Sequence, residues 1–71
     1  MAYVRAGARV CVTPKKTAKG KGLSYSSFCG KLAEDAVVGP TAGWDVVDVI
    51  DSRGRERSVY SFSLRRGRAR R

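Results

Sequence analysis

The stretch WDVVDVIDSRGRERSVYSFSL, residues 44–64, decides the expected fold because it has the pattern of a β-hairpin. Two runs rich in β-branched and aromatic residues, 44–50 and 58–64, lie on either side of the turn-prone string DSRGR. Such residues favour extended backbone, whereas a short polar string containing glycine favours a reversal of the chain. The sequence therefore predicts two antiparallel strands joined by a tight turn.

The length of the turn predicts the register of this hairpin. If residues 52–54 form a three-residue loop with Gly54 in the left-handed conformation, Asp51 faces Arg55 across the two strands. The register then gives the later pairs, which are Val46 with Tyr60 and Trp44 with Phe62 on one face, and Val47 with Val59 on the other.

We expect the core face to be the one that carries Trp44, Tyr60 and Phe62, because it holds the largest apolar side chains. On this assignment Trp44 packs between the hairpin and a helix expected upstream of it. Asp48 falls on the same face, a conflict that a bulge or an edge position would have to resolve.

Upstream of the hairpin, SSFCGKLAEDAVV at residues 26–38 has apolar residues at helical spacing. Gly39 and Pro40 follow it as a typical helix stop, and Gly30 inside it costs up to about 1 kcal/mol relative to alanine. The sequence predicts an α-helix here. Its apolar face would hold Phe28, Cys29, Leu32, Ala33, Ala36 and Val37.

The N-terminal part of the chain predicts one further strand. Val10 and Val12 alternate with Arg9, as in a half-buried strand, and Pro14 ends the pairing because it lacks an amide hydrogen. Tyr3 and Val4 would extend this strand across Gly7. The segment KKTAKGKG that follows, residues 15–22, has no apolar anchor and is predicted to be a mobile surface loop.

The order of elements is then β-α-β-β, which predicts a small, open, two-layer α+β domain over residues 1–65 with a flexible, arginine-rich tail at 66–71. A five-stranded SH3-like β-barrel is the alternative. In the barrel, residues 23–38 form strands around Gly30 instead of a helix.

Residues 26–65 also resemble small, uncharacterised bacterial and phage proteins with β-α-β-β order. The resemblance rests on a Gly-Trp-acidic-x-Val-x-Val strand, which this chain has from Gly43 to Val49, and on the spacing to Phe62 and Arg65. It implies a fold and no activity.

Charge is sorted along the chain, with basic ends and an acidic middle. Residues 1–31 contain no acid, residues 32–51 contain no base, and arginines dominate again over residues 52–71. A net charge of +9 in 71 residues favours a polyanionic partner. We therefore predict a nucleic-acid-binding protein, DNA or RNA, that contacts phosphates with little sequence preference.

The predicted contacts lie on the lysine loop, the hairpin turn and the arginine tail. Tyr25, beside the loop, is predicted to stack on bases, whereas Tyr60 and Phe62 are assigned to the core. The full set of candidate residues is Lys15, Lys16, Lys19, Lys21, Tyr25, Arg53, Arg55, Arg65, Arg66, Arg68, Arg70 and Arg71.

Two other functions are compatible with the charge pattern. In one, the acidic block docks on a large host protein such as RNA polymerase, as small phage- or plasmid-type adaptors and inhibitors do. The residues for that contact would be Glu34, Asp35, Asp45 and Asp48. In the other, the protein is ribosome-associated, since basic tails are typical of ribosomal proteins. A homo-oligomer would add buried surface to so short a chain.

Several function classes lack support in the sequence. Without histidine, a serine or cysteine nucleophile has no usual base and a zinc site is incomplete, so we expect no enzyme, no metal and no cofactor. No apolar run has the length of a membrane span or a signal peptide, which predicts a cytoplasmic protein without a membrane partner. Cys11 and Cys29 are then expected to be reduced, buried residues.

Overall fold

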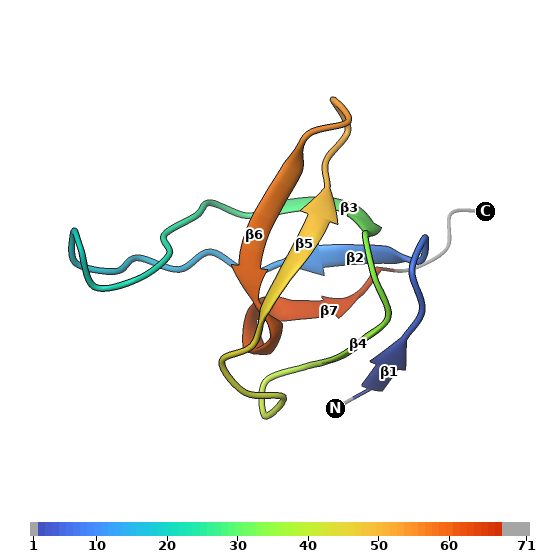
Figure 1. Ribbon diagram of the computed structural model, residues 1–71, viewed down its shortest axis with the longest axis horizontal. Coiled ribbons are helices and arrows are strands. Elements are labelled where there is room, and N and C mark those ends of the chain that lie inside the picture. The colour runs from blue at the N-terminus through green and yellow to red at the C-terminus, as the bar shows by residue number, and fades with distance from the viewer. Residues whose placement is uncertain (1, 68–71) are drawn as a thin grey trace.

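The computed structural model describes residues 2–67, and these form an all-β domain without an α-helix (Figure 1). Five strands form one antiparallel sheet in the order β6-β5-β3-β2-β7, and two form a second sheet, β1-β4. This architecture corrects the predicted α+β, β-α-β-β domain. The strands are β1 (Ala2–Val4), β2 (Arg9–Val12), β3 (Phe28–Leu32), β4 (Ala36–Val38), β5 (Val46–Ile50), β6 (Glu56–Tyr60) and β7 (Leu64–Arg66), with a 3-10 turn η1 (Ser61–Ser63) before β7.

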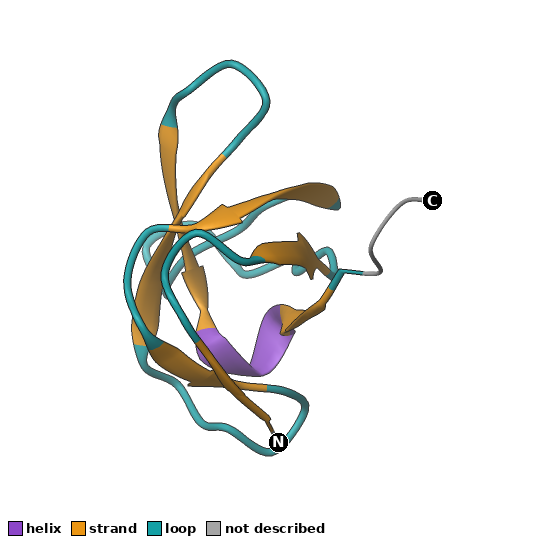
Figure 2. Ribbon diagram, turned by 90° about the vertical axis from the view of Figure 1, so that its right-hand side faces the viewer, coloured by secondary structure: helices purple, strands orange, loops and turns teal. Residues whose placement is uncertain are grey.

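Both sheets curve around one small core (Figure 2). Strand β4 connects them, because it pairs with β1 and also contacts η1 and β7. Valine dominates the core, as suits a closely curved sheet in which β-branched side chains pack on the pleated surface. The buried apolar residues are Val4, Val10, Val12, Leu32, Val38, Val47, Val49, Val59 and Leu64.

The β5–β6 hairpin has the predicted turn and register. The backbone N–H of Asp51 donates to the carbonyl oxygen of Arg55 (2.9 Å), and Gly54 has the left-handed φ of +80° that a three-residue loop requires. Val46 pairs with Tyr60, as expected. The turn is held further by the Asp51 carboxylate, which accepts hydrogen bonds from the backbone N–H groups of Arg53 (2.9 Å) and Arg55 (3.0 Å).

The predicted core face of this hairpin is wrong. Val47 and Val59 are buried, whereas Trp44 and Val46 on the other face are 68% and 56% exposed. In a strand, a correct register leaves open which of two apolar faces turns inward, and here the narrow valine core excludes the bulky rings. The conflict at Asp48 disappears on the outer face, where its carboxylate accepts a hydrogen bond from the Ser58 hydroxyl (2.9 Å).

The predicted helix at residues 26–38 is also wrong, because these residues form β3 and β4. Strand β3 pairs with β2 on one side and β5 on the other, so partners distant in sequence outweigh the local helical spacing. Gly30 lies in the middle of β3, and a Cβ atom there would overlap the carbonyl oxygen of Ile50 in β5. The glycine that weakens a helix is the residue that allows this close strand pair.

At the N-terminus, β2 is confirmed as a half-buried strand, with Val10 and Val12 inside. The expected extension across Gly7 does not occur. Instead the chain turns at Gly7, whose φ is +89° and whose N–H donates to the Leu32 carbonyl (2.7 Å), and the separate strand β1 pairs with β4.

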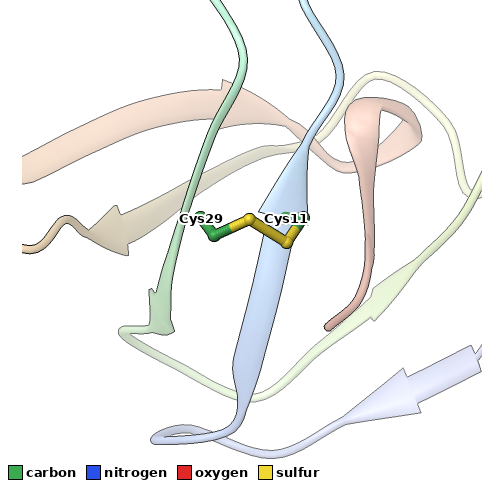
Figure 3. The surroundings of a disulfide bond; sticks show 2 residues. All are labelled: Cys11 and Cys29. Carbon is green, nitrogen blue, oxygen red and sulfur yellow. A yellow bond between two sulfur atoms is a disulfide. The ribbon is translucent and has the colours of Figure 1, made fainter. Parts of the chain in front are cut away.

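The cysteines differ from the prediction of two reduced thiols. Strands β2 and β3 place Cys11 directly opposite Cys29, and the two form a disulfide (Figure 3). Cys29 is exposed and Cys11 is half-buried. The predicted helix over residues 26–38 places Cys29 in a different element from the strand of Cys11, so the sequence did not indicate this pairing.

At the C-terminal end, β7 continues past the predicted domain boundary at residue 65. Arg66 pairs with Val10, and the N–H of Gly67 donates to the Arg9 carbonyl (2.9 Å). Arg68, Arg70 and Arg71 of the predicted tail lie outside the described residues. Over residues 2–67, the chain has no helix of the length and apolarity that a membrane crossing needs.

Candidate nucleic-acid interface

The segment between β2 and β3, residues 13–27, is an extended hairpin that projects from the body of the domain (Figure 1). We call it the lysine hairpin. Lys15 and Tyr25 form a two-way backbone bridge (both 2.9 Å), and the Ser24 hydroxyl accepts from the Thr17 N–H (2.9 Å). These bonds order a segment that the sequence suggested was a mobile loop. Its exposed cations are Lys16, Lys19 and Lys21.

Beside the base of this hairpin, three rings form a cluster on the outer surface of the domain. Tyr60 and Phe62 stack with ring centres 5.4 Å apart, and Trp44 meets both edge-on at 5.2 and 4.7 Å. These are favourable aromatic geometries. We call Trp44, Tyr60, Phe62 and the adjoining Lys15 the aromatic surface.

Lys15 brings a positive charge to these rings. Its ammonium nitrogen lies 5.2 Å from the centre of the Trp44 ring and 5.4 Å from that of Phe62, within the range of cation–π attraction. Lys15, Trp44 and Phe62 line a groove of about 460 Å³ together with Pro40, Thr41 and Gly43.

The lysine hairpin also fixes the position of Tyr60. The Leu23 N–H donates to the Tyr60 hydroxyl oxygen (3.0 Å), and at Gly22 a Cβ atom would lie only 2.5 Å from that oxygen. Gly22 thus permits the approach of the returning hairpin strand. As a result, the loop lysines and the aromatic rings belong to one connected structure.

Tyr25, the predicted stacking residue, is half-buried against the core. Its hydroxyl donates to the Ser63 Oγ (2.7 Å) and accepts from the Tyr60 N–H (3.2 Å). The ring therefore anchors the hairpin to the β6–η1 corner. In the neighbouring ring cluster Trp44 is exposed, whereas Tyr60 and Phe62 are half-buried.

Within residues 2–67, the predicted arginines are not gathered at this surface. Arg53 and Arg55 lie at the tip of the β5–β6 hairpin, at a different end of the molecule from the lysine hairpin (Figure 1). In β7, Arg65 is exposed and pairs with Cys11. It shares the outer face of the sheet with Arg9 and Lys31, which pair with each other across β2 and β3.

Three of the six acidic residues, Asp35, Asp48 and Asp51, accept hydrogen bonds within the fold. Asp35 accepts hydrogen bonds from the Ala6 N–H (2.7 Å) and the Tyr3 hydroxyl (2.9 Å), and these two bonds, in that order, lower the pKa of its carboxyl. The bond to Asp35 in turn raises the pKa of Tyr3. The Arg55 N–H is the main reason that the pKa of Asp51 is lowered.

Of the acids predicted to dock on a protein, the structure brings three together and separates the fourth. Glu34, Asp35 and Asp45 line a groove of about 260 Å³ that also contains Val46. Asp48 does not line this groove and bonds to Ser58 within the hairpin instead.

Sequence reasoning missed the aromatic surface and the basic pair Arg9–Lys31. The sequence prediction places Trp44 in the core. The alternation of Val47 and Val49 with Val46 and Asp48 is equally compatible with a strand that buries the face of Val47 and Val49. Arg9 alternates with buried valines in β2 and could have been found from that pattern. Lys31 could not, because its segment was assigned to a helix.

Residues 2–67 contain no group of three side chains suited to hold a metal ion. No protein-family model, curated protein or solved structure matches this chain. The resemblance to small bacterial and phage proteins stays a prediction, and the β-α-β-β order that it implied is not the one observed.

Proposed function

We propose that this protein binds nucleic acid without catalysing a reaction, mainly by contacting phosphates and with little sequence preference. The observation that carries the proposal is the lysine hairpin, a projection on which Lys16, Lys19 and Lys21 are exposed and which contains no acid over residues 13–27. Lysines on such a projection can follow a phosphate backbone and release its condensed counterions.

The state of the acidic residues supports this proposal. Within the described part of the chain one ion pair forms, between Arg57 and Asp51 (3.6 Å). Asp35 and Asp48 accept hydrogen bonds from neutral donors of the fold. Few cations within residues 2–67 are therefore held in ion pairs, which leaves the exposed lysines available to contact phosphates.

The test is the salt dependence of binding to a short DNA duplex. For Lys19→Gln with Lys21→Gln, we expect weaker binding and a log-log salt slope that shrinks by up to about 1.8, at about 0.9 for each lost phosphate contact. Fluorescence anisotropy at several salt concentrations measures both quantities. Wild-type affinity that does not change with salt would contradict the proposal.

Arg53→Gln with Arg55→Gln is the matched control, since it removes the same charge from the other end of the molecule. We expect it to change the slope less than the lysine variant does. Equal losses from both variants would mean that overall charge, and not the lysine hairpin, determines the binding.

A protein partner is a second candidate, and the groove lined by Glu34, Asp35 and Asp45 favours it. Carboxylates beside the exposed apolar side chain of Val46 suit a basic, partly apolar protein surface. A pull-down with and without nuclease distinguishes the two functions, because only a protein partner is retained when nucleic acid is removed. The suggested association with ribosomes would appear in the same experiment as nuclease-sensitive ribosomal proteins.

A further inference from the structure

We propose that the aromatic surface stacks on an unpaired base, so that the protein prefers single-stranded nucleic acid to duplex. This inference rests on the proposed function and adds to it the form of nucleic acid that is bound. It concerns Trp44, Tyr60, Phe62 and Lys15, none of which takes part in the buried core.

The exposure of Trp44 is the first observation. It is the only tryptophan of the chain and is 68% exposed, while the core beneath is closed by valines and leucines. The fold therefore does not need the indole for its core. An exposed indole with Phe62 beside it in an open groove offers a π-face to a flat partner.

The second observation is that the rings are held in place before any partner arrives. Trp44 packs edge-on against two rings, and the Tyr60 hydroxyl is fixed by the Leu23 N–H. The Phe62 N–H donates to the Gly43 carbonyl (3.1 Å), which holds the segments that carry Phe62 and Trp44 together. Rings fixed in this way lose little conformational entropy when a base stacks on them.

The third observation is the cation beside the rings. Lys15 Nζ lies 5.2 Å from the Trp44 ring centre, and the lysine hairpin continues away from it with Lys16, Lys19 and Lys21 exposed. Stacking rings next to a cationic track are the combination by which proteins bind single strands. In a duplex the bases are stacked on one another, so a base can reach Trp44 only after it is unstacked.

A cationic ligand is the other chemistry that aromatic clusters recognise, as in cages for quaternary ammonium groups. Here Lys15 already lies over two of the rings, and the net charge of +9 repels a further cation. The positive charge around the rings therefore favours a ligand that joins a flat ring to an anionic group, as a nucleotide does.

The test compares three DNA probes, namely oligothymidylate, an abasic strand of equal length and a duplex. The abasic strand keeps the phosphates but offers nothing to stack. We expect wild-type protein to bind oligothymidylate most tightly, with quenching of the Trp44 fluorescence that the abasic strand does not cause. Trp44→Leu should weaken binding to oligothymidylate by roughly 5- to 150-fold and leave binding to the abasic strand unchanged.

Trp44→Phe is the matched control, because it keeps an aromatic face where leucine keeps only apolar volume. We expect it to retain more affinity than Trp44→Leu. Equal binding of oligothymidylate and the abasic strand, or tighter binding of the duplex, would overturn this inference while leaving phosphate binding intact. Failure to bind all three probes would instead overturn the proposed function. If a variant fails to fold, the quenching of wild-type Trp44 fluorescence by oligothymidylate and not by the abasic strand still tests the inference.

Discussion

At the scale of single residues, Gly30 has the most demanding surroundings in the domain. The carbonyl group of Ile50 occupies the space into which a side chain at Gly30 would project, and the Val49 side chain approaches the same point (3.1 Å). Relief of the overlap caused by a side chain at Gly30 would require β5 to move away from β3. Those two strands are joined through only two residue pairs. The absence of a side chain at this position thus keeps β5 and β6 attached to the remaining strands.

We therefore expect Gly30→Ala to destabilise the protein by at least about 1–3 kcal/mol, the usual cost of overpacking a closely packed site. In a domain of this size each kcal/mol lowers the melting temperature by roughly 4–8 °C. Thermal unfolding followed by circular dichroism measures the shift. Ser27→Ala, an exposed position just before β3, serves as the control and should melt with the wild type. Equal melting of the two variants would show that β5 adjusts without cost.

At the scale of elements, the Asp35 carboxylate joins two turns. It bonds to the Ala6 N–H in the turn before β2 and, through Tyr3, to strand β1, while its own backbone lies between β3 and β4. Its lowered pKa means that the folded protein favours the charged carboxylate. The resulting stability is present above the unfolded pKa, near 4, and is lost as the pH falls through the folded pKa.

Asp35→Asn should accordingly be less stable than wild type at neutral pH, and the difference between the two should narrow below about pH 4. Urea unfolding at a series of pH values measures it. Glu34→Gln is the control, because it removes the same charge from the neighbouring residue and leaves the bonds of Asp35 to Ala6 and Tyr3 in place. A difference in stability between wild type and Asp35→Asn that persists at pH 2 would show that Asp35 stabilises the fold through its shape and not through its charge.

The elements also show why some of the structure was predictable. The β5–β6 register follows from local chemistry, because Asp51 and Gly54 specify the turn and the turn specifies each later pair. For residues 28–32 the local apolar spacing favours a helix. Their partners in β2 and β5 lie far along the chain, and two-sided pairing decided the outcome.

The candidate site, too, could be predicted only in part from the sequence. Composition and charge pointed correctly to exposed lysines at residues 16, 19 and 21. The position of Trp44 depends on which face of a correctly registered hairpin turns inward, and that depends on the volume of a core assembled from distant strands. Charged loops can therefore be located from sequence alone here, whereas the aromatic surface required the assembled sheet.

At the scale of the whole molecule, the Cys11–Cys29 bond converts the lysine hairpin into a closed covalent ring. The bond joins positions 18 residues apart, and the exposed residues Lys16, Lys19 and Lys21 lie on the chain between them. A cut inside the ring opens it without dividing the molecule. A lysine-specific protease should thus nick the hairpin at Lys16, Lys19 or Lys21 and spare Lys31, which is paired on both sides in β3.

The nicked protein should migrate as one species until a reductant is added, and then separate into two fragments by electrophoresis or mass spectrometry. Two fragments without reductant would show that the ring is not closed. Disulfides persist in oxidising compartments and are rare in the cytosol, so the two environments give this protein different fates. In an oxidising setting it can be cut in its most exposed segment and remain a single molecule, whereas in a reducing one the same cut releases two pieces held only by their shared sheet.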